Sequence, residues 1–216
     1  MSGYSRSDTN LNWIDQIQNV LDPIEVRQRP PRHGDGNLNG HASPTGCKLK
    51  PAAVLALIIK DGDELSLTFT QRADHLQAHA GQISFPGGRQ NVGRESLAEC
   101  ALRETEEEVG IAPEQIELLG RWDSYETVTG YEVTPFVGIM DGPVEFVTDP
   151  GEVADVFMVP LEFLMDPKNH RLEEKEFRGM LRRFYAMPWQ GRYIWGATAG
   201  MLKALTDRLA SSKAGV

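Results

Sequence analysis

The chain is 216 residues long and carries 31 acidic against 22 basic residues, giving a formal net charge of −9 and a pI near 5.1. This acidic balance disfavours sequence-independent nucleic-acid binding and attachment to anionic membranes, since both need clustered Lys and Arg. No apolar run approaches the roughly 18 residues of a membrane span, and the N-terminus lacks a signal-peptide core. Two cysteines, Cys47 and Cys100, are too few for a disulfide framework, so a cytoplasmic location is expected.

The first 50 residues are predicted to form a short helix and an irregular arm. Apolar residues recur at helical spacing over residues 10–21. Residues 22–50 contain many Pro, Gly, Asn and Arg residues and few large apolar ones, which is typical of irregular structure. The main domain is therefore expected at residues 51–211, with a tail at 212–216.

From Pro51 onward the sequence predicts more strands than helices. The predicted strands are 52–59, 65–71, 82–85, 116–124, 133–140 and 153–159, followed by a late hairpin of 171–177 and 182–187. A helix is predicted between the capping-box residue Ser96 and the stop at Gly110. Further helices are predicted at 161–165 and 195–210. Most connections are too short for βαβ crossovers, so an α+β sandwich with a mixed sheet is favoured over a doubly wound sheet.

The helix that begins at Ser96 carries a run of glutamates. Glu104 and Glu108 lie one turn apart on one face and Glu107 flanks Glu104, so the three carboxylates are expected to converge on one semi-buried patch. Like charges at these spacings repel one another unless a cation or a proton neutralises them. An all-carboxylate set suits Mg²⁺ or Mn²⁺, and Arg103 is placed to form a salt bridge with Glu107. The alternative is a solvated acidic face, which an arbitrary glutamate run more often forms.

The residues from Arg103 to Ile111 resemble the second half of the Nudix box, with Thr105 where an aliphatic residue is usual and Glu95 seven residues before Arg103. The loop between Gly88 and Glu95 has six residues where the box has five. This extension and the upstream segment Phe69–Gly88 resemble the coenzyme A pyrophosphatase branch of that family. Two downstream segments also look like that branch, 150–161 and 193–198, whereas Gln77 stands where the branch has an Arg.

The resemblance implies a Nudix-type α/β/α sandwich that hydrolyses a nucleoside diphosphate linked to another moiety. For coenzyme A or an acyl-CoA the products would be 3′,5′-ADP and a 4′-phosphopantetheine compound. The alternatives are a Nudix hydrolase of nucleoside triphosphates, oxidised nucleotides or ADP-ribose, and a catalytically silent binding module of the same fold. Such modules usually lose acids of the box, and these acids are present here. The implied partner is a small-molecule nucleotide, and a homodimer is allowed although the sequence shows no interface signal.

The resemblance also implies roles for individual residues. The implied metal ligands are Glu104, Glu107 and Glu108. The implied catalytic residues are Glu107, Arg103 and Glu152. The implied substrate-binding residues are Arg72, Phe85, Gly87 and Gly88.

Several of these residues have ordinary structural alternatives. Glu152 is alternatively a surface acid at a strand edge, and Arg72 a partner in a surface salt bridge. Cys100 is expected to be a small core residue rather than a nucleophile. Three late aromatic residues are candidates either for stacking on an adenine or, as the favoured alternative, for anchoring the last helix to the sheet. These are Trp189, Tyr193 and Trp195.

Overall fold

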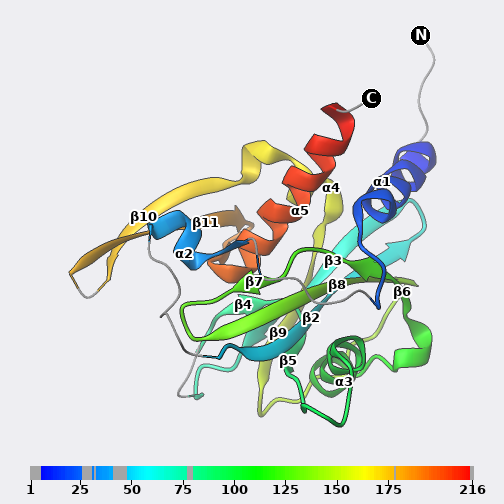
Figure 1. The fold of residues 1–216 in the computed structure, drawn as a ribbon. Helices are drawn as coiled ribbons and strands as arrows, with labels where there is room; N and C mark the ends of the chain where they lie inside the picture. Colours follow the sequence, from blue (N-terminus) through cyan, green and yellow to red (C-terminus); the bar gives the residue numbers. More distant parts are fainter. Residues whose placement is uncertain are drawn as a thin grey trace.

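A central mixed sheet has helices on both of its faces in the computed structural model, which describes residues 6–25, 31, 33–40, 48–76, 80–177 and 179–214 (Figure 1). Helix α3 (Leu97–Val109) covers one face, and α1 (Arg6–Val20) and α5 (Ala197–Ala214) lie on the other. The shorter helices are α2 (Asp35–Asn39) and α4 (Leu161–Met165). Short 3₁₀ turns span Pro113–Gln115 and Pro167–Asn169. This layering confirms the predicted α/β/α sandwich.

The strands form one large sheet and one small sheet. The large sheet contains β1 (His33–Gly34), β2 (Lys50–Asp61), β3 (Glu64–Arg72), β4 (Ile83–Ser84), β5 (Gly87–Arg89), β6 (Glu117–Arg121), β7 (Tyr125–Glu126), β8 (Tyr131–Asp141) and β9 (Val153–Pro160). The small sheet contains β10 (Arg171–Phe177), β11 (Met180–Trp189) and β12 (Arg192–Trp195).

The large sheet mixes parallel and antiparallel pairs, as the sequence predicts. Strand β2 runs parallel to β8 and antiparallel to β3, and β9 pairs antiparallel with β3. The order is β1-β7-β8-β2-β3-β4, with β5 beside β2, β6 beside β8 and β9 beside β3. This order places β5, which carries Gly87 and Gly88, beside β2 and against α3, and it places β4 and β9 beside β3, which ends at Arg72.

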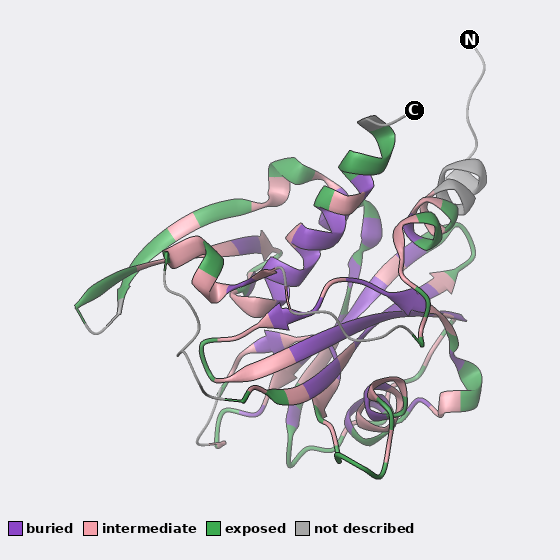
Figure 2. Cartoon of the chain, in the orientation of Figure 1, coloured by how far each residue is buried: buried purple, intermediate pink, exposed green. Residues whose placement is uncertain are grey.

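Strand β2 explains why the first strand of the domain reads as a nearly unbroken apolar run. Alternate residues face opposite sides of a sheet. Leu55 and Leu57 are buried toward α3, whereas Ala56 and Ile58 are buried toward α5. Figure 2 shows the resulting buried centre of the sheet. A strand covered on both faces has no polar side, so it loses the alternation that marks a half-exposed strand.

The N-terminal arm is less irregular than predicted. Strand β1 pairs in parallel with β7, and α2 follows it directly. The Asp35 carboxylate accepts a hydrogen bond from the Tyr125 hydroxyl at 2.9 Å and another from the Val128 N–H at 2.9 Å. Polar side chains therefore attach this segment to the body, and a search for apolar periodicity misses such contacts. The boundaries at residues 50 and 211 stay a prediction.

Two more differences concern the residues at which the last helix begins and ends. Residues 192–195 form strand β12, so the last helix begins at Ala197 rather than near Trp195 and ends at Ala214. Gly196, with φ +66°, separates the strand from the helix.

Within the described residues, no helix combines the length and the apolarity that crossing a membrane requires. Cys47 and Gln77, which the sequence analysis names, lie outside the described residues.

Candidate active site

Local chemistry fixes both ends of α3. The Ser96 hydroxyl accepts a hydrogen bond from the Glu99 N–H at 3.1 Å, and the Glu99 carboxylate accepts one from the Ser96 N–H at 2.7 Å. Gly110 adopts the left-handed conformation with φ +74°, and its N–H donates to the Glu106 carbonyl at 2.9 Å. These contacts confirm the predicted capping box and stop. Thr105 is fully buried at its usually aliphatic position because its hydroxyl donates to the Ala101 carbonyl at 2.7 Å.

Glu108 is the most deeply buried acid of the helix, with 7% of its surface exposed. Its carboxylate accepts hydrogen bonds from the Thr70 hydroxyl at 3.3 Å and from the Gly87 N–H. Burial is the main reason that the pKa of Glu108 rises to about 8, and the charges of Glu104 and Glu152 push it in the same direction. The structure thus holds a buried carboxyl without a full counter-charge, which favours its protonated form in the absence of a cation.

Two glycines let the sheet backbone approach these acids. A Cβ at Gly88 would lie 2.4 Å from the Glu104 carboxyl carbon, so a side chain there would displace that carboxylate. A Cβ at Gly87, where φ is +155°, would lie 2.4 Å from the Ala53 carbonyl oxygen. Burial raises the pKa of Glu104, and hydrogen bonding to Arg103 opposes the rise. Gly87 and Gly88 therefore allow β5 to lie close to β2 and to the Glu104 carboxylate.

Arg103 is the cation at the centre of the site. Its Nε and Nη2 bind the two Glu95 oxygens, each at 2.9 Å, while Nη1 binds Glu104 at 2.8 Å and Glu107 at 2.9 Å. The hydrogen bonds from Arg103 are the main cause that lowers the pKa of Glu95 to about 2. The guanidinium holds three carboxylates in place, including the expected Glu107.

The predicted convergence of three acids on one buried patch is wrong for Glu107. Its side chain is 58% exposed and turned toward Arg103, so burial groups Glu104 with Glu108 instead. Among the described residues, no three His, Cys, Asp or Glu side chains are arranged to hold a metal ion. The charge of these residues nevertheless suits a divalent cation. The carboxyls of Glu104 and Glu108 are desolvated. Arg103 Nη1 also bridges Glu104 and Glu107, as a bound cation would.

The remaining predicted residues are Glu152, on the loop before β9, and Arg72, at the end of β3. Glu152 is exposed on the loop before β9, and its carbonyl accepts a hydrogen bond from the Ala73 N–H at 2.9 Å. Its carboxylate acts electrostatically on Glu104 and Glu108, so it belongs to the same site. Arg72 ends β3 beside this loop and is half-buried.

Phe85 requires a correction. The Phe85 ring is 1% exposed and stacks on Phe69 with ring centres 5.1 Å apart. The predicted substrate contact is therefore wrong for this side chain, which belongs to the core. Cys100 is fully buried as expected, and burial raises the pKa of its thiol to about 12, so it is not a nucleophile at neutral pH. Thr70 is a site residue that the sequence analysis missed.

The metal-free protein is expected to lose stability as pH rises from about 5 to about 8. The pKa of Glu108 is raised in the folded state, so between its unfolded value of 4.5 and about 8 the folded chain holds a proton that the unfolded chain has released. The stability that protonated Glu108 contributes is fully present below the unfolded pKa and is lost as pH rises through the folded one. Thermal melting with a chelator measures this loss, and Glu108→Gln should flatten the profile. A wild-type profile as flat as that of the variant would contradict the buried-carboxyl account.

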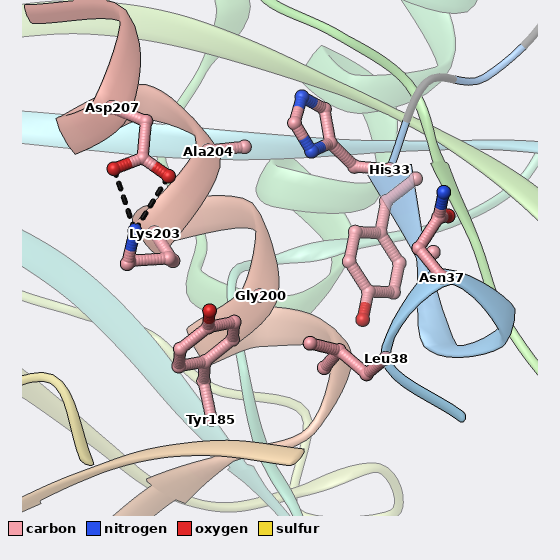
Figure 3. Close-up of a pocket in the computed structure, with 10 residues that line it drawn as sticks. His33, Asn37, Leu38, Tyr185, Gly200, Lys203, Ala204 and Asp207 are labelled. Atoms are coloured by element: carbon pink, nitrogen blue, oxygen red, sulfur yellow. Dashed lines mark hydrogen bonds and ion pairs between the residues drawn. The ribbon is translucent and has the colours of Figure 1, made fainter. Parts of the chain in front are cut away.

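A separate hollow of about 110 Å³ lies between the arm and α5 (Figure 3). Lys203 and Asp207 form an ion pair at its rim, and His33 and Tyr185 line it. The large sheet lies between this hollow and α3. None of the residues that line it belongs to the predicted site.

Comparison with known proteins identifies the family. The family model described as NUDIX domain matches residues 49–184. The chain is 35% identical over 173 residues to a Yersinia pestis (strain Pestoides F) protein named "Uncharacterized Nudix hydrolase NudL", covering 80% of this chain and 86% of that one. A MutT protein from Methanosarcina mazei Go1 is 18% identical, with a TM-score of 0.49 over 78% of this chain and 99% of the other. The chain therefore belongs to the Nudix hydrolase family, whose enzymes cleave diphosphate bonds in small nucleotides and generally use divalent metal ions.

Proposed function

We propose that this Nudix hydrolase cleaves a nucleoside diphosphate linked to another moiety, with coenzyme A or an acyl-CoA as substrate, and that it uses Mg²⁺ or Mn²⁺. Water would add to one phosphorus while the bond from the bridging oxygen to that phosphorus breaks. The products would be 3′,5′-ADP and a 4′-phosphopantetheine compound. We further propose that the enzyme acts in the cytoplasm, because its two cysteines are too few for a disulfide framework.

The observation that carries this proposal is the way the two sequence motifs meet. The upstream segment from Phe69 to Gly88, which resembles the coenzyme A branch, contributes the end of β3, all of β4 and the start of β5. Its residues Thr70 and Gly87 hydrogen-bond the Glu108 carboxylate. The segment that suggests the substrate and the helix that suggests the chemistry therefore share one site.

The proposed roles follow from the environment of each residue. Diphosphate hydrolysis needs cationic charge on the phosphate oxygens and a carboxylate that orients or deprotonates water. A bound divalent cation would supply that charge. Glu104 and Glu108 are the proposed primary ligands because their carboxyls are desolvated, and Glu107 is the proposed third ligand.

Two further roles belong to residues outside the helix. Glu152 is the proposed acid that acts on water, because it is exposed and close enough to Glu104 and Glu108 to raise both of their pKa values. Arg72 is the proposed contact to a substrate phosphate, for which a planar guanidinium is suited. Arg103 fixes Glu107 and Glu95 and so acts as a positioning residue.

A substrate panel tests the assignment. Initial rates would be measured with Mg²⁺ and with Mn²⁺ on CoA, acetyl-CoA, oxidised CoA, ADP-ribose, NADH and dGTP. The expected result is a higher kcat/KM for the CoA compounds than for the other nucleotides. Equal or better turnover of ADP-ribose or dGTP would contradict the CoA assignment and favour the other Nudix hydrolase class. No turnover of any compound would favour a binding module.

A further inference from the structure

Aromatic side chains gather on the outward face of the small sheet, where the sequence analysis favoured a role in anchoring the last helix. Tyr193 and Trp195 of β12 are each 39% exposed. The Trp195 ring lies 5.3 Å from Phe184 of β11 in an edge arrangement and 6.5 Å from Tyr193. Of the three candidates, Trp189 alone packs inward, against Phe163 of α4. The anchoring interpretation is therefore wrong for Tyr193 and Trp195.

Strand register shows which charged residues share this face. Residues directly opposite one another in neighbouring strands lie on the same side of a sheet. Glu173 is opposite Phe184, Lys175 is opposite Arg182, and both Arg171 and Trp195 are opposite Ala186. Among the described residues of β10 to β12, this face, here called the aromatic-basic face, carries the following charged side chains: Arg171, Lys175, Arg182 and Glu173. Three cations against one anion make it basic in a chain whose net charge is −9.

Contacts confirm that these groups are neighbours. The Tyr193 hydroxyl donates a hydrogen bond to Glu173. Partial burial and this hydrogen bond raise the pKa of Tyr193 to about 12, while the Arg171 guanidinium opposes the rise. Arg171, Glu173 and Tyr193 therefore meet across the β10 to β12 face.

The aromatic-basic face is connected to the candidate active site through β4. Strand β12 lies beside β4, and the Thr198 hydroxyl, three residues after Trp195, donates to the Ile83 carbonyl at 3.2 Å. Ser84 follows Ile83 and lies 3.5 Å from the Thr70 hydroxyl, which binds Glu108. Strand β12 and the start of α5 are thus connected through β4 to the Thr70–Glu108 hydrogen bond.

We propose that the aromatic-basic face binds the nucleotide end of the substrate, with the base stacked on Trp195 beside Phe184 and a ribose phosphate held by Lys175 and Arg171. Aromatic side chains stack on any nucleobase, and cations beside them fit an attached phosphate. The cations of this face complement an anionic ligand, its exposed aromatic rings fit a nucleobase, and a second copy of the chain is an outcome that the test distinguishes. The inference rests on the proposed function, because it assumes that the substrate carries a phosphorylated nucleotide.

Binding of 3′,5′-ADP in the presence of a chelator, followed by calorimetry, tests this site without any hydrolysis. The wild type should bind 3′,5′-ADP, and Trp195→Ala should weaken binding about tenfold, the size of one lost stacking contact. Trp195→Phe should keep most of the affinity. Leu172→Ala is the matched control, because Leu172 is an exposed apolar residue of the same sheet on the opposite face.

A second comparison tests the phosphate contact. Wild type should bind 3′,5′-ADP more tightly than AMP, and Lys175→Gln should reduce that preference. Arg183→Gln, which changes a cation on the opposite face, should retain it. Unchanged binding in both Trp195→Ala and Lys175→Gln, no binding by the wild type, or an altered oligomeric mass of Trp195→Ala with unchanged binding would each overturn the site.

The outcome separates the two proposals. The predicted binding pattern without CoA hydrolysis would reject the proposed function and keep the nucleotide site. Hydrolysis of CoA by the wild type, with the same KM in Trp195→Ala and Leu172→Ala, would reject the nucleotide site alone.

Discussion

Replacing Glu108 by Gln is expected to lower kcat by roughly a thousandfold while the metal-free protein becomes more stable at neutral pH. Charge stabilisation by a bound metal is worth several kcal/mol, and each ~1.4 kcal/mol is a factor of ten in rate. The amide cannot replace a carboxylate as a metal ligand of equal charge. It can still accept the hydrogen bonds of Thr70 and Gly87. At neutral pH the unfolded chain has released the Glu108 proton, and folding must take it up again. The amide removes this cost, so folding becomes more favourable.

The control for this experiment is Glu106→Gln, which changes an exposed acid of the same helix. Initial rates and thermal melting with a chelator would be measured on both variants. Near-normal activity of Glu108→Gln would contradict its role in the site. Loss of activity together with a lower melting temperature would show that Glu108 supports the fold instead.

Replacing Arg103 by Ala is expected to lower both activity and stability. The substitution leaves Glu95, Glu104 and Glu107 without the guanidinium that they share. Removing one partner of a partly buried ion network leaves charges uncompensated, which costs more than losing an exposed pair. Groups that orient metal ligands typically contribute about 10–100-fold to activity, and we expect a loss toward the upper end. Arg103→Lys should rescue little, because an ammonium cannot form the two-pronged contact to Glu95.

Arg183→Ala is the matched control for Arg103→Ala. Arg183 also pairs with a glutamate, Glu174, but both side chains are exposed on the small sheet. Its removal should change the melting temperature little and leave kcat unchanged. Equal effects of the two substitutions, measured by melting and initial rates, would mean that the Arg103 network has no special function.

The sequence predicts well those features that local chemistry determines. The helix Leu97–Val109 is bounded by a capping box and a left-handed glycine, and both signals lie within a few residues of the ends that they set. The burial of Glu108 follows from the same helical period. The family resemblance adds the fold, because the motif residues occupy a known order along the chain.

Features that depend on distant residues could not be predicted in this way. Thr70 and Glu108 are 38 residues apart, so no local pattern reveals their hydrogen bond. The direction of Glu107 depends on the fork of Arg103, which helical spacing does not specify. The predicted helix begins at Trp195, the last residue of β12, because only the left-handed Gly196 separates Trp195 from the helical residues that follow.

Product analysis of CoA hydrolysis, with Mg²⁺ and with a chelator, tests the central claim most directly. Desolvated acids at Glu104 and Glu108 should keep the enzyme inactive until a divalent cation compensates their charge. The account predicts that 3′,5′-ADP and 4′-phosphopantetheine form in equal amounts with Mg²⁺ and that neither forms with the chelator. Intact CoA after incubation with the metal-loaded enzyme, or the same rate in both conditions, would contradict it.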